Sequence, residues 1–139
     1  MNTAAIVYRS RTGTTQRYAE QIGAHLRTKG IQVVVGSVGD LDPRELAKVD
    51  FVLLGCWTNG LMVILQHPDQ PWIAFAREIP ALGSARVALF TTYTMRTGSM
   101  FRKMRAELGQ AADVSSLELK SRDGSLSAAD RAALDAFVA

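Results

Sequence analysis

The sequence predicts an α/β fold with an open, doubly wound sheet of parallel strands. Apolar, β-branched runs alternate along the chain with longer amphipathic segments, which is the pattern of strands joined by crossover helices. Runs such as Val33–Val35 and Val52–Leu54 are apolar at consecutive positions, and this favours strands that are buried on both faces. The 139 residues fit one compact domain, since domains typically contain about 100 to 150 residues, so we predict a single domain over residues 1–139.

Five apolar runs are predicted to form the strands. In chain order they are Ala4–Tyr8, Ile31–Val35, Phe51–Leu54, Val87–Phe90 and the weaker run Val114–Leu119. The longest apolar stretches fall well short of the roughly 20 residues of a membrane-spanning helix, so we expect no membrane span. A single cysteine cannot form an internal disulfide, and the chain opens without an apolar secretion leader, so we expect a soluble, cytoplasmic protein.

Four helices and one short turn are predicted between and after these strands. Segment Thr15–Lys29 places its apolar side chains on one face at helical spacing, with Gly30 as its stop. The second crossover has room only for a helical turn around Pro43–Leu46. The later helices are Trp72–Ile79 after Asp69 and Pro71, Met100–Leu108 between the cap Ser99 and Gly109, and a last helix that opens on a Ser127–Asp130 capping box and reaches Val138.

The loop after the first strand gathers hydroxyl groups at the start of the strongest predicted helix. It contains Ser10, Arg11, Thr12, Gly13, Thr14 and Thr15. Ligands of open α/β sheets bind beyond the carboxyl ends of the strands where the strand order reverses, and a helix N-terminus with several hydroxyls favours a phosphate without needing a cation. The loop lacks both the Gly-Lys-Ser/Thr ending of triphosphate loops and the three-glycine dinucleotide pattern. The alternative is a Ser/Thr-rich turn that only caps the helix.

The residues around this loop resemble the signature of the flavodoxin family. The matching residues are Ile6, Val7, Tyr8, Ser10, Gly13, Thr15, Ala19 and Ile22. The resemblance implies a five-stranded sheet of order 2-1-3-4-5 with helices on both faces, and it implies non-covalently bound FMN with its phosphate in this loop. Flavodoxin is the standard example of this strand order, which therefore comes from the resemblance and not from the apolar runs alone.

The resemblance also assigns the loops after the third and fourth strands to the flavin ring. After the third strand the implied contacts are Cys56, Trp57, Thr58, Asn59 and Gly60, and after the fourth they are Thr91, Thr92 and Tyr93. Trp57 is the stacking candidate, although many family members carry their aromatic nearer the position of Asn59. Gly60 matches a family glycine that lets a peptide carbonyl turn toward the flavin, and Tyr93 is the candidate for the other face of the ring. For Trp57 the alternative is simple packing at a strand end.

No catalytic residue and no metal site are predicted. Cys56 has no partner nearby in sequence, so a small buried side chain is favoured over a redox role. His25 and His67 belong to no metal-ligand spacing or nucleophile triad. One further apolar group is interpreted either as a rim for a quinone or dimer contact or as side chains buried beneath the loop: Leu61–Leu65, Met95 and Met100.

Two functions follow from the resemblance. The first is an FMN electron carrier that passes electrons between redox partner proteins, which suits a small chain without acid–base apparatus. The alternative is a flavodoxin-type oxidoreductase that acts directly on a quinone or porphyrinogen, since Arg11 after Ser10 resembles the flavodoxin-type protoporphyrinogen oxidases. Those relatives favour an acid where Thr12 stands and carry a long inserted loop, which this sequence lacks. A non-redox interaction module has no positive feature to support it.

The charge of the chain bears on its partner. Sixteen Lys and Arg against 13 Asp and Glu give a formal net charge of +3. Cations in or just after the expected flavin loops predict a basic rim that suits an acidic redox partner or an anionic substrate. They are Arg11, Arg17, Arg96, Arg102, Lys103 and Arg105. We expect no nucleic-acid partner, and the sequence leaves the oligomeric state open.

Overall fold

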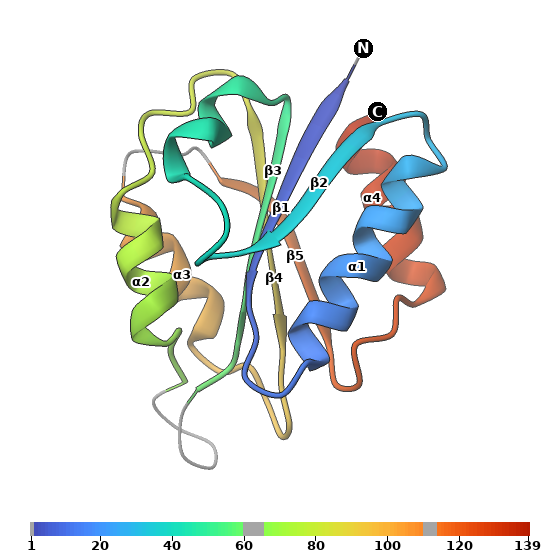
Figure 1. Ribbon diagram of the computed structural model, residues 1–139. Coiled ribbons are helices and arrows are strands. Elements are labelled where there is room, and N and C mark those ends of the chain that lie inside the picture. Colours follow the sequence, from blue (N-terminus) through green and yellow to red (C-terminus); the bar gives the residue numbers. More distant parts are fainter. Residues whose placement is uncertain (1, 60–65, 110–113) are drawn as a thin grey trace.

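A computed structural model describes residues 2–59, 66–109 and 114–139 of the chain (Figure 1). It contains a five-stranded sheet in the order β2-β1-β3-β4-β5, and all neighbouring strands are parallel, as predicted. The strands are β1 (Thr3–Arg9), β2 (Gln32–Ser37), β3 (Phe51–Trp57), β4 (Arg86–Thr92) and β5 (Val114–Ser121). Each extends past the carboxyl end of the apolar run that predicted it, because backbone pairing continues there, and β2 begins one residue later than predicted.

Helices cover both faces of the sheet, with α1 and α4 on one side and α2 and α3 on the other (Figure 1). They are α1 (Thr14–Arg27), the 3-10 helix η1 (Pro43–Lys48), α2 (Gln70–Arg77), α3 (Met100–Leu108) and α4 (Ala128–Val138). The Ser127–Asp130 capping box is present. Ser99 occupies the N-cap position of α3 as predicted, but its side chain makes no cap hydrogen bond, and its hydroxyl donates instead to the carbonyl of Gln66 at 2.9 Å.

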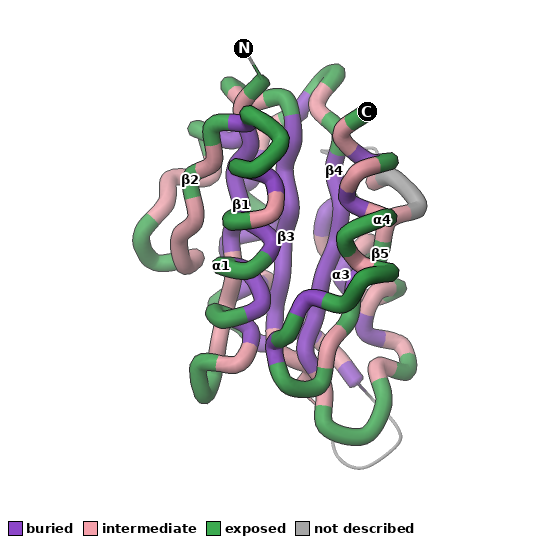
Figure 2. Tube along the Cα trace, turned by 90° about the vertical axis from the view of Figure 1, so that its right-hand side faces the viewer, coloured by how far each residue is buried: buried purple, intermediate pink, exposed green. Residues whose placement is uncertain are grey.

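Two hydrophobic layers enclose the central strands, which are buried along most of their length (Figure 2). Beneath α1 and α4, the Tyr18 ring meets the Phe90 ring edge-on with centroids 5.9 Å apart. The Phe90 ring crosses over Gly55 on β3, where an added Cβ would lie 2.0 Å from a ring carbon. Beneath α2 and α3, the largest fully buried side chains include Trp72 and Met104. The central strands are therefore closely packed on both faces.

Strand β2 departs from the expectation of burial on both faces. Val34 is 55% exposed, whereas Val33 and Val35 pack against the layer beneath α1. The reason is that β2 is the edge strand beside β1 and has a helix packed closely on one face only. Among the described residues, no helix is long and apolar enough to cross a membrane.

Candidate functional site

A cavity of about 520 Å³ opens at the edge of the sheet where β1, β3 and β4 end. Its volume lies within the roughly 300–1,000 Å³ of small-molecule sites. The lining residues are Arg11, Thr12, Thr14, Thr15, Trp57, Thr58, Asn59, His67, Thr92, Tyr93, Thr94 and Arg122. Hydroxyl groups, aromatic rings and cations share this lining, and no Asp or Glu of the described chain belongs to it.

The loop between β1 and α1 forms the polar end of the cavity. Gly13 has a φ of 96°, a left-handed conformation that glycine adopts without strain, and its N–H donates to the Ser10 hydroxyl oxygen at 3.0 Å. Helix α1 then begins at Thr14 with no acidic residue in its first turn. The first N–H groups of a helix lack intrahelical acceptors and carry partial positive charge, so the loop presents donors toward the cavity.

The four hydroxyls of this loop do not play the same part. Those of Thr12 and Thr14 lie 3.5 Å apart on residues that line the cavity. Thr15 is fully buried and its hydroxyl pairs with that of Thr92 at 2.6 Å, which ties the start of α1 to the end of β4. Ser10 lies outside the lining and accepts a bond within the loop. The Ser10 and Thr15 hydroxyls therefore shape the loop, whereas the hydroxyls of Thr12 and Thr14 pair with each other on residues that line the cavity.

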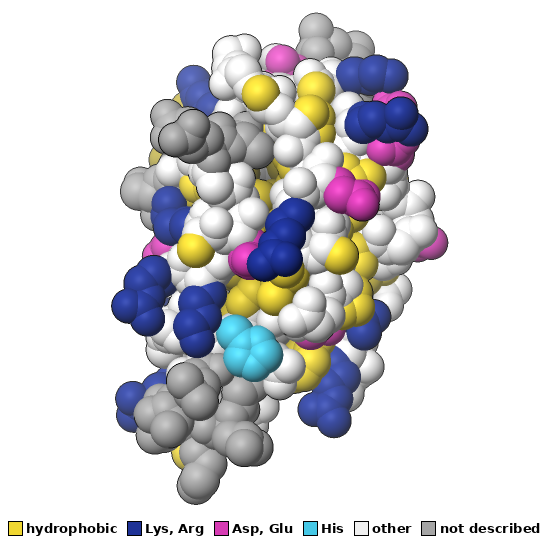
Figure 3. All heavy atoms as spheres, turned by 90° about the vertical axis from the view of Figure 1, so that its left-hand side faces the viewer, with side chains coloured by type: hydrophobic (Ala, Val, Ile, Leu, Met, Phe, Trp, Pro, Cys, Tyr) yellow, Lys and Arg dark blue, Asp and Glu magenta, His cyan; other side chains and the backbone are white. Residues whose placement is uncertain are grey.

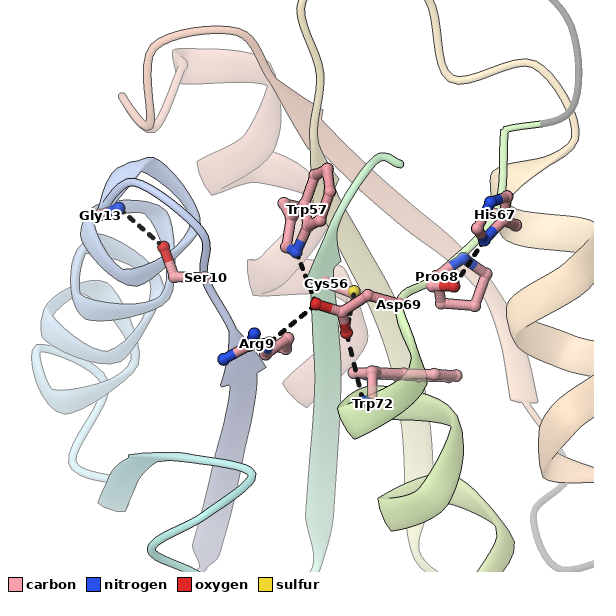
Figure 4. Close-up of polar contacts among 9 residues, drawn as sticks. All are labelled: Arg9, Ser10, Gly13, Cys56, Trp57, His67, Pro68, Asp69 and Trp72. Atoms are coloured by element: carbon pink, nitrogen blue, oxygen red, sulfur yellow. Dashed lines mark hydrogen bonds and ion pairs between the residues drawn. The ribbon is translucent and has the colours of Figure 1, made fainter. Parts of the chain in front are cut away.

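Trp57, the last residue of β3, lines the cavity, and its indole N–H points toward Asp69 (Figure 4). Indole Nε1 donates to Oδ2 of Asp69 at 2.7 Å, and Nε of Arg9 donates to the same oxygen at 2.7 Å. The guanidinium carbon of Arg11 lies 5.2 Å from the ring centroid, within range of a cation–π contact. Trp57 is therefore held by ionic groups on β1, on the β1–α1 loop and at the start of α2.

The other oxygen of Asp69 faces the interior. Oδ1 accepts from the backbone N–H of Trp72 at 3.3 Å, which caps α2, and Sγ of Cys56 lies 3.7 Å away. Cys56 is fully buried and burial raises its thiol pKa far above the usual range, so the thiol stays neutral. The interpretation of Cys56 as a buried structural side chain agrees with this position, and Cys56 is absent from the cavity lining.

Tyr93 forms a second aromatic wall just after β4. Its backbone N–H donates to the Ser121 carbonyl at 3.2 Å, and two cations flank its ring. Nζ of Lys120 lies 5.9 Å and the guanidinium carbon of Arg122 lies 5.3 Å from the ring centroid. Thr91, expected as a flavin contact, is instead buried behind this wall, because its hydroxyl donates to the Cys56 carbonyl at 2.6 Å.

The two ends of the loop after β3 are joined by an isolated antiparallel β-bridge between Asn59 and His67. Asn59 and His67 exchange two backbone hydrogen bonds, of 3.1 and 2.7 Å, and both residues line the cavity. Gly60 and Leu61–Leu65 lie outside the described residues, so the glycine and most of the apolar group cannot be placed. Of the group's other members, Met100 is buried in the core and Met95 is 58% exposed.

The cations close to the cavity differ from those expected. Arg11 is there as predicted, but Arg122 and Lys120 replace most of the remainder. Arg17 donates to the Asp123 carbonyl, and Arg105 pairs with Glu118. On the face covered by α2 and α3, Lys and Arg side chains are spread from one end of the molecule to the other, with Asp and Glu side chains among them (Figure 3).

Sequence reasoning missed three residues of this site: Arg9, Asp69 and Arg122. Asp69 was identified only as a helix start, yet it is the sole acid between Asp50 and Glu78. An isolated acid in an otherwise apolar stretch is the signal that could have shown its second role, because a buried carboxylate needs partners. Nothing in the sequence links Arg122 to Tyr93, since 28 intervening residues separate them.

Comparisons with known proteins agree on one family. The flavodoxin family model matches residues 6–133. The chain is 34% identical over 98 residues to the flavodoxin of Clostridium beijerinckii, covering 70% of this chain and 69% of that one. It is 40% identical over 55 residues to the NADPH sulfite reductase flavoprotein alpha-component of Thiocapsa roseopersicina, covering 40% of this chain but only 10% of that longer protein.

A solved structure shows the same fold. A short-chain flavodoxin associated with a bacterial microcompartment superposes with a TM-score of 0.76 at 17% identity, covering 99% of this chain and 94% of that one.

Proposed function

Because this chain belongs to the flavodoxin family of FMN-binding electron-transfer proteins, we propose that the cavity where β1, β3 and β4 end holds FMN without a covalent bond. One observation carries the proposal. A helix N-terminus, threonine hydroxyls and two aromatic side chains line one cavity that contains no described acidic side chain. We also propose that residues 1–139 form a single FMN-binding domain.

The residues present fit the chemistry of this cofactor. Its phosphate needs several hydrogen-bond donors and no nearby carboxylate, and the hydroxyls of Thr12 and Thr14 lie with the N-terminus of α1 at one end of the cavity. Its flat ring system needs apolar faces, which Trp57 and Tyr93 supply at the ends of β3 and β4. The proposed contacts are Arg11, Thr12, Gly13, Thr14, Trp57, Thr58, Asn59, Thr92 and Tyr93. Ser10 and Thr15 shape the loop, and Gly60 lies outside the described residues.

The chain's own residues bind, orient and tune the cofactor. The flavin supplies reversible one-electron redox chemistry. The loop that starts α1 fixes the phosphate, and the two aromatic walls orient the ring and exclude water from its faces. Arg11 and Arg122 add positive potential to the lining, which favours negative charge on the bound group.

We further propose a redox partner with an acidic docking face and a cytoplasmic location. Arg11, Lys120 and Arg122 surround the aromatic walls, and complementary charge speeds the encounter of two proteins. The relative in Thiocapsa is a flavoprotein component of a larger reductase, which agrees with electron transfer between flavoprotein and partner. Direct turnover of a quinone or porphyrinogen is not proposed, because the flavodoxin relatives favour electron transfer. The proposed cytoplasmic location rests on cysteine usage: Cys56 is the single cysteine of the sequence and is buried as a free thiol, which suits a reducing compartment.

A titration of the cofactor-free protein tests the binding proposal. We expect FMN fluorescence to be quenched with a stoichiometry of one, because the ring stacks between aromatic side chains. Riboflavin, which lacks the phosphate, is the matched control and should bind at least about 100-fold more weakly. Absence of quenching by FMN, or equal affinities for FMN and riboflavin, would contradict the proposed site.

A further inference from the structure

Asp69 lies outside the cavity but contacts one of its walls. The side chain of Asp69 is 10% exposed, and the residue is absent from the cavity lining. Oxygen Oδ2 accepts from the Trp57 indole and from the Arg9 guanidinium, both at 2.7 Å, and Figure 4 shows the three side chains converging behind the indole ring. A carboxylate so deeply buried requires a cationic partner and hydrogen-bond donors, and it has both.

This arrangement fixes the orientation of the indole ring. The indole has a single polar atom, Nε1, and a hydrogen bond to an ionised acceptor is shorter and stronger than one between neutral groups. Nε1 donates to Asp69, which lies outside the cavity lining, so rotation of the indole ring about its side-chain torsions would break this hydrogen bond. Asp69 is itself held in place because it caps α2. The position of the indole ring therefore depends on the start of α2.

We propose that Asp69 is a positioning residue for the cofactor, acting through Trp57, with Arg9 balancing its charge. The inference rests on the proposed function, because it assigns Trp57 to the flavin ring. Asp69 fixes the orientation of the Trp57 indole before the cofactor binds, so that little conformational entropy of this side chain is lost on binding. Its removal weakens binding through Trp57 alone.

A helix cap offers a different account of the same residue. Asp69 accepts from the Trp72 N–H, and loss of a cap destabilises a protein whatever Trp57 does. Asp69→Ser separates the two roles, because serine is a good cap but is too short to reach the indole. Asp42→Ser is the matched control, since Asp42 caps η1 by accepting from the Arg44 N–H and lies outside the cavity lining.

A double-mutant cycle with Trp57→Phe measures whether Asp69 acts through the indole. In the wild-type background we expect Asp69→Ser to weaken FMN binding about tenfold, which corresponds to about 1.4 kcal/mol. In the Trp57→Phe background, which has no indole N–H to hold, we expect a change below about twofold. Asp42→Ser should leave the affinity unchanged. Equal losses in both backgrounds, or no loss with Asp69→Ser, would overturn the inference.

Indole N–H signals in the NMR spectrum of the cofactor-free protein provide a readout independent of FMN. The chain has two tryptophans, and Trp57→Phe assigns their signals. Nε1 of Trp72 is buried without a partner among the described residues, so the two indoles differ in environment. We expect Asp69→Ser to shift the Trp57 signal upfield and speed its hydrogen exchange, and an unchanged signal would contradict the anchor. If wild-type protein fails to bind FMN, the proposed function falls, and this signal alone decides whether Asp69 holds Trp57.

Discussion

The two ends of the cavity are built from different chemistry. The polar end is the loop that starts α1, where hydroxyls and backbone N–H groups are arranged by bonds within the loop and to Thr92. At the aromatic end, Trp57 and Tyr93 each lie among ionic side chains: Arg9, Arg11 and Asp69 for the first, Lys120 and Arg122 for the second.

This difference separates two tasks that a cofactor site must perform. Neutral donors at a helix N-terminus hold an anion without bringing a mobile charge near the redox centre, and we expect the polar end to supply most of the affinity. We expect charges around the aromatic end to act on the energy of an added electron and so to set the redox potential. Substitutions at the two ends should therefore change different measured quantities.

The largest effect is expected from a charge at the polar end. Thr12→Glu places a carboxylate where the phosphate is proposed to lie, and like charges at contact distance repel strongly even with partial screening. We expect FMN affinity to fall by more than about 100-fold. Ser84→Glu, an exposed position just before β4 at the opposite edge of the sheet, is the control. Undiminished affinity in Thr12→Glu would place the phosphate elsewhere.

Loss of an aromatic wall should cost less than the misplaced charge, and the two walls should differ. We expect Trp57→Ala to weaken FMN binding by about ten- to 100-fold, since stacking of one heteroaromatic base on an aromatic side chain is worth about 1–3 kcal/mol. Tyr93→Ala should cost roughly fivefold, because its phenol ring is smaller than an indole and has no anchor comparable to Asp69. The affinities come from the same fluorescence titration, and equal losses would show that the anchored wall has no advantage.

Charge reversal at the aromatic end should alter the potential more than the affinity. Arg122 lines the cavity and favours added negative charge on the bound group, so Arg122→Glu should lower the potential of the second electron. We expect a decrease on the order of tens of millivolts that shrinks at high salt. Lys48→Glu, at the end of η1 and away from the cavity lining, is the control in the same redox titration. A potential that does not move would remove Arg122 from the field of the ring.

The polar end could be predicted from the sequence and the surroundings of the aromatic end could not. Ser10–Thr15 is one continuous loop between a strand and a helix, so local pattern identifies it. Asp69 lies 12 residues after its partner Trp57, and Arg9, which shares the same Asp69 oxygen, lies 48 residues before Trp57. Lys120 and Arg122 lie 27 and 29 residues after Tyr93. Contacts of that separation depend on how strand ends meet in space, which hydrophobic periodicity does not encode.

The same limit explains the errors in the fold. Parallel strands and helices were predicted well because apolar spacing, capping boxes and glycine stops are local signals. The run Val33–Val35 could not reveal that β2 is an edge strand, since edge position belongs to the whole sheet. Serine is a common N-cap residue, but the hydroxyl of Ser99 donates to the Gln66 carbonyl instead of accepting from the helix.

Charge pairs outside the cavity should affect stability slightly and FMN binding not at all. Asp135 on α4 pairs with His25 and Lys29 of the α1 end, and the hydrogen bond from His25, followed by that from Lys29, lowers the pKa of the Asp135 carboxyl. A carboxyl whose pKa is lower in the folded state adds stability above its unfolded pKa and loses it as the pH falls through the folded value. Asp135→Asn should therefore lower the urea midpoint slightly at neutral pH, and the difference should shrink below about pH 4. A difference that persists in acid, or a change in FMN affinity, would show that this pair does more than link α1 to α4.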